Sequence, residues 1–447
     1  MATLAGFPYF EIQFTKEGIV FQPEEVTDLI NLLSESQITD LLVLSHGWNN
    51  DMEEARSLYQ RLGTLFAAEI AKRPELVERK FAIAAVLWPS KKFAEEDLIA
   101  GGGAASLTTA APTDVLINQL RELQNFFDGD ESTAIVQQAI DKVDQFGADL
   151  NAPRKYVALI QQLIAKASPE KEGEPEDFSA SHVNKNDPTD LLNRLSDVRL
   201  ANSTDFIGDS TGLSGSSTTT DFNAGGGAGG LFDLSGLTNG ARNLLNFATY
   251  YQMKDRAGKV GVLGLNPILK RIKQTLPNCK LHLIGHSFGA RVVTAATAGP
   301  DTISTVPIDT LSLLQAAFSH YGFAENYEDG KDGFFRSVLT QRKVKGPILI
   351  SQTHNDKAVG VAYAIASRIA GQIGAFLGDP NDLFGGLGAN GAQKTPASST
   401  QFNLDFGSVY SFQINTLYNL NADNCIMDHS DICHPQVANA IVSSIAT

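Results

Sequence analysis

One serine in this sequence has the surroundings of an activated nucleophile. Residues 280–293 read KLHLIGHSFGARVV, in which an apolar stretch leads into Gly285, Ser287 and Gly289 and then into a helical pattern. A G-x-S-x-G pattern between a buried strand and a helix predicts a sharp turn that exposes the serine hydroxyl. The glycines leave room for the helix to pass close to the strand. The alternative is an ordinary strand–helix turn with an inactive serine.

A nucleophilic serine needs a base that takes its proton and an acid that orients the base. Asp356 follows an apolar strand predicted at 346–352, and His429 lies just before a helix predicted near the C-terminus. The order Ser287, Asp356, His429 is the order of nucleophile, acid and base that open α/β sheets use. His434 is an alternative base.

Other residues could compete for the role of the acid. Asp309 or Asp332 could serve only if 346–352 were not a strand, and Asp356 could instead be an ordinary turn aspartate. His354 is a further candidate base, but it precedes Asp356 and would break the chain order.

The oxygen of an attacked carbonyl needs N–H donors to stabilise its developing charge. The backbone N–H of Phe288, directly after the serine, would be one donor. The second would be the N–H of Trp48, in the sequence HGW that follows a strand predicted at 40–45. The Trp48 ring could also pack under its loop, which is compatible with backbone donation.

Four residues near these motifs are candidates for binding a substrate: His46, Gly47, His286 and Tyr251. Gly47 would let the backbone approach the substrate closely. Tyr251 belongs to TYYQMKDR at 249–256, whose Tyr250, Tyr251, Lys254 and Arg256 could line an acyl or phosphate site. Helix packing with solvated charges is the more common outcome for such a cluster.

Cysteines and histidines near the C-terminus have spacings that a zinc site could use. Cys425, His429, Cys433 and His434 would be crowded as ligands, and a zinc-bound His429 could not act as a base. We therefore expect no metal at these residues. A disulfide between Cys425 and Cys433 would require export, whereas three cysteines in 447 residues favour a reducing cytoplasm.

The elements that must position these residues alternate between strand and helix. Apolar or alternating stretches predict strands at 9–14, 40–45, 81–87, 281–284, 311–318, 346–352 and 409–415. Helical periodicity occurs at 23–34, 52–72, 114–127, 134–146, 156–167, 237–247, 263–276, 359–376 and 435–445. This alternation predicts an α/β fold with a mostly parallel sheet flanked by helices.

A long insertion separates the strand at 81–87 from the nucleophile strand. We predict a catalytic domain formed by 1–95 and 236–447, and a helical insertion at 96–167 that acts as a cap or lid. A decorative insertion is the alternative. The Ser/Thr/Gly-rich segment 168–235 is predicted to be flexible because it holds few large apolar residues.

Composition limits the partners. The formal net charge of −15, from 35 basic and 50 acidic residues, disfavours nucleic acid as a partner. No apolar run is long enough for a membrane span, so we expect no integral membrane contact. The N-terminus does not resemble a secretion signal, which leaves the cytoplasm as the expected location. Oligomeric state is not predicted.

Together the stretches VLSHGWNND, VLWPS, LIGHSFGARVV, THNDKAVG and DHSDICHP resemble an α/β-hydrolase of the serine esterase or lipase type. The resemblance covers about residues 1–95 and 236–447. It implies a serine hydrolase that cleaves small-molecule or lipid-like esters without metal or cofactor. The matching positions are Ser287, Asp356 and His429 for the triad and Trp48 and Phe288 for the oxyanion hole.

This chain departs from many lipases in one respect, because its large insertion precedes the nucleophile strand, whereas their lid follows a later strand. Two alternatives stay open: an acyltransferase that uses the same triad, and a non-catalytic binding or scaffold protein with an α/β-hydrolase fold.

Overall fold

A computed structural model describes residues 2–90, 112–167, 183, 187–196, 234–300, 306–356, 358–359, 383–396 and 398–447. Most of the segment 168–235, part of the insertion 96–167 and most of the predicted helix 359–376 lie outside these residues. The chain forms two compact units. The first comprises Met1–Lys92, Ile164–Asn184 and Phe247–Thr447, and the second comprises Phe93–Leu163 and Lys185–Asn246.

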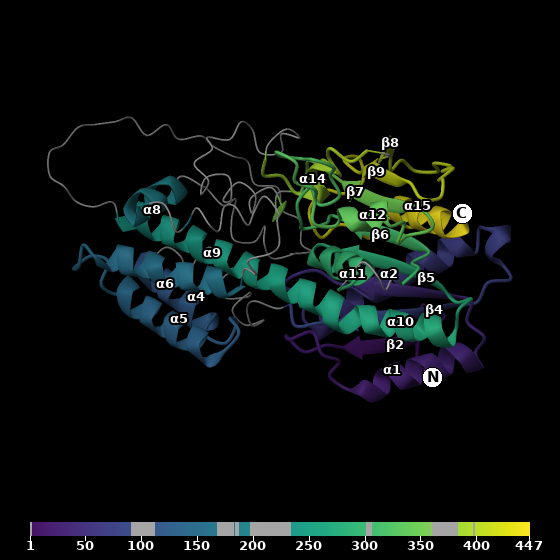
Figure 1. The fold of residues 1–447 in the computed structure, drawn as a ribbon, viewed down its shortest axis with the longest axis horizontal. Coiled ribbons are helices and arrows are strands. Elements are labelled where there is room, and N and C mark those ends of the chain that lie inside the picture. The colour runs from purple at the N-terminus through teal and green to yellow at the C-terminus, as the bar shows by residue number, and fades with distance from the viewer. Residues whose placement is uncertain are drawn as a thin grey trace. The chain divides into compact units, whose positions relative to one another are not determined.

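The first unit contains a nine-stranded sheet with the strand order β1-β2-β4-β3-β5-β6-β7-β9-β8 (Figure 1). Its strands are β1 (Thr3–Leu4), β2 (Phe7–Gln13), β3 (Asp40–Ser45), β4 (Phe81–Leu87), β5 (Lys280–His286), β6 (Thr310–Leu314), β7 (Ile348–Gln352), β8 (Ser398–Asn403) and β9 (Leu417–Asn421). Only the β1–β2 pair is antiparallel among the described strands. The predicted α/β fold with a mostly parallel sheet is confirmed.

The central strands are apolar because helices cover both faces of the sheet. Every residue of β3, β4, β6 and β7 is buried. A strand with water on one face would alternate apolar and polar residues, whereas a strand buried on both faces must be apolar almost throughout. The charged residue among them is Asp40 at the start of β3, whose buried carboxylate binds Arg79 and His282.

Helices of the first unit pack on both faces of the sheet (Figure 1). They are α1 (Pro23–Glu35), α2 (Met52–Ile70), α10 (Asn266–Thr275), α11 (Phe288–Ala298), α12 (Arg336–Thr340), α14 (Leu387–Asn390) and α15 (Pro435–Ala446), with short helices η1 (Pro74–Leu76) and η3 (Val260–Leu265). Helices α2 and α15 share one apolar core with the sheet, through Phe66 and Ile441 among others. Helices α1, α10 and α11 form a second group, with α1 against β2 and α11 against β5.

The start of α2 fixes the loop that carries the HGW sequence. Asp51 accepts hydrogen bonds from the N–H groups of Glu53 and Glu54, and the Glu54 carboxylate accepts one from the Asp51 N–H. This reciprocal cap satisfies N–H groups that have no acceptor within the helix. The loop between β3 and α2 is therefore anchored at its α2 end.

The second unit is helical in its described residues. It contains α4 (Pro112–Glu122), α5 (Asp130–Val143) and α8 (Pro188–Ser196), and parts of α6 (Ala152–Ala167) and α9 (Leu234–Lys259). The Tyr156 hydroxyl donates to the Ala241 carbonyl at 2.9 Å, which joins α6 to α9. The predicted helical insertion before the nucleophile strand is thus confirmed, while its role as a cap remains a prediction.

The predicted strand at 409–415 is wrong, and β9 begins after it, at Leu417. The alternating pattern arises from a different cause, because Tyr410 and Phe412 pack against Phe402 of β8. The Gln413 N–H donates to the Tyr418 hydroxyl rather than to a neighbouring strand. An aromatic cluster therefore imitates the period of a strand.

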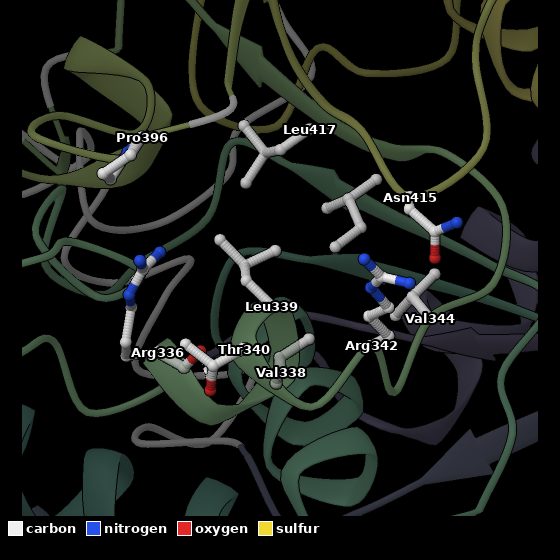
Figure 2. Close-up of a pocket in the computed structure, with 10 residues that line it drawn as sticks. Arg336, Val338, Leu339, Thr340, Arg342, Val344, Pro396, Asn415 and Leu417 are labelled. Carbon is white, nitrogen blue, oxygen red and sulfur yellow. Dashed lines mark hydrogen bonds between the residues drawn. The ribbon is translucent and has the colours of Figure 1, made fainter.

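A cavity of about 240 Å³ lies at the amino ends of β7 and β9, where Ile348 and Leu417 begin these strands (Figure 2). Residues of α12 line it as well, and Figure 2 shows Arg342 near Asn415. The candidate catalytic residues follow the carboxyl ends of the strands. The cavity and the candidate catalytic residues therefore lie at opposite ends of the strands.

The packing of α11 predicts a strict requirement for glycine at position 289. A Cβ atom there would lie 2.2 Å from the Ser45 carbonyl oxygen and 2.4 Å from that of His46. We expect Gly289→Ala to lower the free energy of unfolding by about 3 kcal/mol, the upper range for overpacking. Urea denaturation measures this loss. In the control Gly147→Ala, where a Cβ would meet nothing within 4 Å, a loss as large as that of Gly289→Ala would contradict the packing argument.

Candidate active site

Ser287 lies on a strained turn between β5 and α11. Its backbone has φ 56° and ψ −125°, a conformation that residues other than glycine rarely adopt. The Ser287 N–H donates to the Leu314 carbonyl at 3.0 Å, and the Ser287 carbonyl accepts from the N–H groups of Ala290 and Ala317. These bonds hold the turn in place, as the sequence pattern predicts.

Gly47 packs directly against the serine. A Cβ atom on Gly47 would lie 2.7 Å from the Ser287 Cβ and 3.3 Å from its Oγ. The loop after β3 therefore reaches the nucleophile through a residue without a side chain. Any larger residue at this position would collide with Ser287.

His429 joins Ser287 to Asp356 through its two ring nitrogens. Its Nε2 lies 2.8 Å from the Ser287 Oγ, and its Nδ1 lies 2.8 Å from the Asp356 Oδ2. Because the carboxylate can only accept, Nδ1 donates to it and Nε2 is left to accept the serine proton. The side chain of Asp356 is fully buried, whereas that of His429 is 19% exposed.

The electrostatic surroundings of His429 favour its protonated form. Burial lowers the pKa of this imidazole, but the charge of Asp356 and the hydrogen bond to it outweigh that effect. The net result is a pKa above the ordinary histidine value. The imidazole can therefore accept a proton from a hydroxyl group more readily than a free histidine.

The alternative candidates for the base and the acid contact other residues. His434 directly precedes α15 and pairs with Asp431 at 2.8 Å. Asp309 pairs with Lys273 at 3.0 Å. His354 pairs with Asp423 at 3.0 Å.

Asp332, the other candidate acid, accepts a hydrogen bond from the Asn326 N–H at 2.9 Å.

Phe288 and Trp48, the predicted oxyanion donors, lie close to each other. Their rings meet edge to face with centroids 5.8 Å apart. Phe288 is the first residue of α11, so its N–H has no acceptor within the helix. The amino end of a helix carries partial positive charge, which favours an anion at this point.

His46 is fully buried and connects two loops. Its Nε2 accepts from the Trp88 N–H at 3.2 Å, its Nδ1 lies 3.0 Å from the Gly47 carbonyl, and its ring stacks on Trp88. Burial lowers the pKa of His46 to about 4, so it stays neutral. Its contacts give it a role in positioning the HGW loop.

His286 supports the loop of the base. Its Nε2 donates to the backbone carbonyl of His429 at 2.8 Å. Burial, aided by the nearby His429, lowers the pKa of His286 to about 3. A neutral imidazole is thereby fixed beside the candidate base.

Tyr251 lies among other aromatic rings. It is 1% exposed and packs edge to face on Phe247 and Tyr250. Tyr250, rather than Tyr251, contacts the ring of Phe288, at 5.3 Å.

Sequence reasoning missed Gln315. Its Nε2 donates to the Asp356 Oδ2 at 3.2 Å, on the same oxygen that binds His429. The residue directly follows β6, the strand beside β5. That position at the carboxyl edge of the sheet is the only signal in the sequence that could have found it.

Asp423 joins the loop of the acid to the loop of the base. Its carboxylate accepts from the Thr353 hydroxyl at 2.8 Å and from the His354 N–H at 2.9 Å. Asn355 completes the link by donating to the carbonyls of Asp423 and Ile426. Burial raises the pKa of Asp423, but the hydrogen bonds from His354 and Thr353 outweigh it and lower the pKa.

In the described part of the chain, no group of three or more His, Cys, Asp or Glu residues could hold a metal ion. Cys279, Cys425 and Cys433 are all free thiols, so the alternative of a Cys425–Cys433 disulfide is wrong. Within the same residues, no helix has the length and apolarity needed to cross a membrane.

Comparisons with known proteins add no further assignment, because no family model, curated protein or solved structure matches the chain.

The link through Asp423 predicts that its loss loosens both loops at once. We expect Asp423→Ala to raise amide hydrogen exchange in 353–356 and 424–429, with a loss of protection of about 2 kcal/mol. Hydrogen exchange with mass spectrometry measures this. Asp28→Ala is the control, since Asp28 is exposed on α1 and lies outside both loops. Unchanged exchange in Asp423→Ala would show that the loops are held independently.

Proposed function

We propose that this chain is a serine hydrolase with an α/β-hydrolase fold that cleaves carboxylic esters through an acyl-enzyme on Ser287. The observation that carries the proposal is the unbroken series of hydrogen bonds from Ser287 through His429 to Asp356. A nucleophile, base and orienting acid in this arrangement are the minimum set for acyl transfer to serine. The residues stand in the order that α/β-hydrolases use.

In the first half of the reaction, the Ser287 Oγ attacks the ester carbonyl carbon while His429 Nε2 takes the hydroxyl proton. Asp356 holds the Nδ1–H and stabilises the imidazolium ion that results. The tetrahedral oxyanion accepts hydrogen bonds from the N–H groups of Phe288 and Trp48. His429 then gives its proton to the alcohol as it leaves, and the acyl group stays on Ser287.

In the second half, water takes the place of the alcohol. His429 removes a proton from the water, which attacks the acyl carbon, and the second tetrahedral intermediate uses the same N–H donors. Collapse of this intermediate releases the carboxylic acid and returns the proton to Ser287. No step requires a metal or a cofactor, and the substrate is a small-molecule or lipid-like ester.

The proposal predicts covalent labelling at a single serine. We expect a fluorophosphonate probe to label the wild type and not Ser287→Ala, and His429→Ala to lower labelling and ester hydrolysis by about 10⁴-fold or more. His434→Ala is the matched control and should retain activity, because His434 contacts Asp431 instead. Mass spectrometry of labelled peptides and hydrolysis of short and long p-nitrophenyl esters provide the measurements. A folded wild type that neither labels nor hydrolyses would favour a binding role for the fold.

The electrostatics of His429 predict the acid side of the pH profile. A general base works only when neutral, so activity is present above its pKa and is lost as the pH falls through it. Because the pKa of His429 is raised above the ordinary value of 6.5, we expect the acidic inflection of kcat/KM to lie above that value. Ester hydrolysis from about pH 5 to pH 9 locates it. An inflection below 6.5 would contradict the dominant effect of Asp356 on the pKa of His429.

A further inference from the structure

Gln315 is held in a single orientation by its neighbours. Its Nε2 donates to the Asp356 Oδ2 at 3.2 Å and to the Gly388 carbonyl at 3.0 Å, and its Oε1 accepts from the Ser351 hydroxyl at 2.7 Å. A carboxylate and a carbonyl can only accept, so the amide nitrogen must face them. Both amide hydrogens are used, and the side chain is fully buried.

The backbone around Gln315 also holds the nucleophile. The carbonyl of Leu314 accepts the Ser287 N–H at 3.0 Å, and the Ala317 N–H donates to the Ser287 carbonyl at 3.2 Å. Gln315 itself has φ 44°, a strained value for a residue other than glycine. One short segment therefore contacts the nucleophile through its backbone and the acid through a side chain.

A close contact with α14 makes this arrangement rigid. A Cβ atom on Gly388 would lie 2.5 Å from the carbonyl carbon of Gln315. The Gln315 N–H, in addition, donates to the Ser351 Oγ at 3.1 Å. The amide and its backbone are thus fixed by β7 and α14 together, and the side chain cannot turn away from Asp356 without breaking several bonds.

We propose that Gln315 is a positioning residue that fixes the Asp356 carboxylate relative to Ser287 and competes with His429 for the same carboxylate oxygen. The inference rests on the proposed function and extends it. A neutral amide is suited to this task, since it orients the carboxylate without cancelling its charge. A cationic side chain in the same place would weaken the attraction between Asp356 and the imidazolium ion.

The variant Gln315→Met tests this role because methionine matches the length of glutamine and donates no hydrogen bond. We expect kcat to fall about tenfold, the effect of one hydrogen bond to a charged group, with KM nearly unchanged. Without the competing donor, Asp356 attracts the imidazolium ion more strongly, so the acidic inflection moves up by roughly half a pH unit. Ser351→Ala removes the donor to the Gln315 amide oxygen, and we expect it to change kcat and the acidic inflection in the same directions but by less. This variant provides the test if Gln315→Met does not fold.

The control is Asn266→Leu, which removes another buried side-chain amide, one that donates to the Ala296 carbonyl. It should lower stability without moving the inflection. An NMR titration of the His429 ring, assigned with His429→Ala, reports its pKa without turnover. Asp356, Asp428 and His286 are the other titratable groups that act on this ring, and none of the variants changes them.

The outcomes separate this inference from the proposed function. A shift of the His429 pKa in Gln315→Met with no turnover in the wild type would support the positioning role and overturn the hydrolase assignment. An active wild type, with kcat and the His429 pKa unchanged in Gln315→Met and Ser351→Ala, would overturn the positioning role and leave the hydrolase assignment standing.

Discussion

The strained backbone of Ser287 is the constraint on which the rest of the site depends. A positive φ at a serine persists only where the surrounding structure fixes it. Here the fixing groups come from three neighbouring strands: Gly289 packs on the end of β3, Gly285 lets α11 cross β5, and Leu314 of β6 accepts the Ser287 N–H. A parallel sheet can supply all three because the carboxyl ends of its strands meet at one edge.

At the carboxyl ends of the strands, the pKa of one histidine differs from those of its neighbours. His46, His286 and His429 lie close together, yet burial keeps the first two neutral, whereas Asp356 raises the pKa of the third. The difference comes from a single contact, since only His429 among these three binds a carboxylate within the described residues. The neutral rings provide shape and hydrogen bonds without adding a charge that would oppose proton transfer.

The loops after β7 and β9 act as one piece because their strands are adjacent in the sheet. Asp423 and Asn355 bind across them, so the acid and the base rest on a common support. Gln315 adds a connection from β6 to the acid. The adjacent strands β6, β7 and β9 thereby hold the acid at a fixed distance from the nucleophile, which flexible loops alone could not do.

The sequence by itself determined the features that depend on neighbours along the chain. The turn at Ser287, the apolar central strands, the position of Asp356 after a strand and that of His429 before the last helix were predictable, since glycine spacing and residue period are local signals. The same signals failed at 409–415, where Tyr410 and Phe412 follow the period of a strand but pack on Phe402.

Only the tertiary structure decided which groups meet. It placed His429 rather than His434 against Ser287, and it brought Gln315 to Asp356 from a distant part of the chain. No local pattern marks a glutamine after a strand as a partner of a carboxylate. Such a contact exists only when β6 and β7 pair in register, so the physical reason lies in long-range strand pairing.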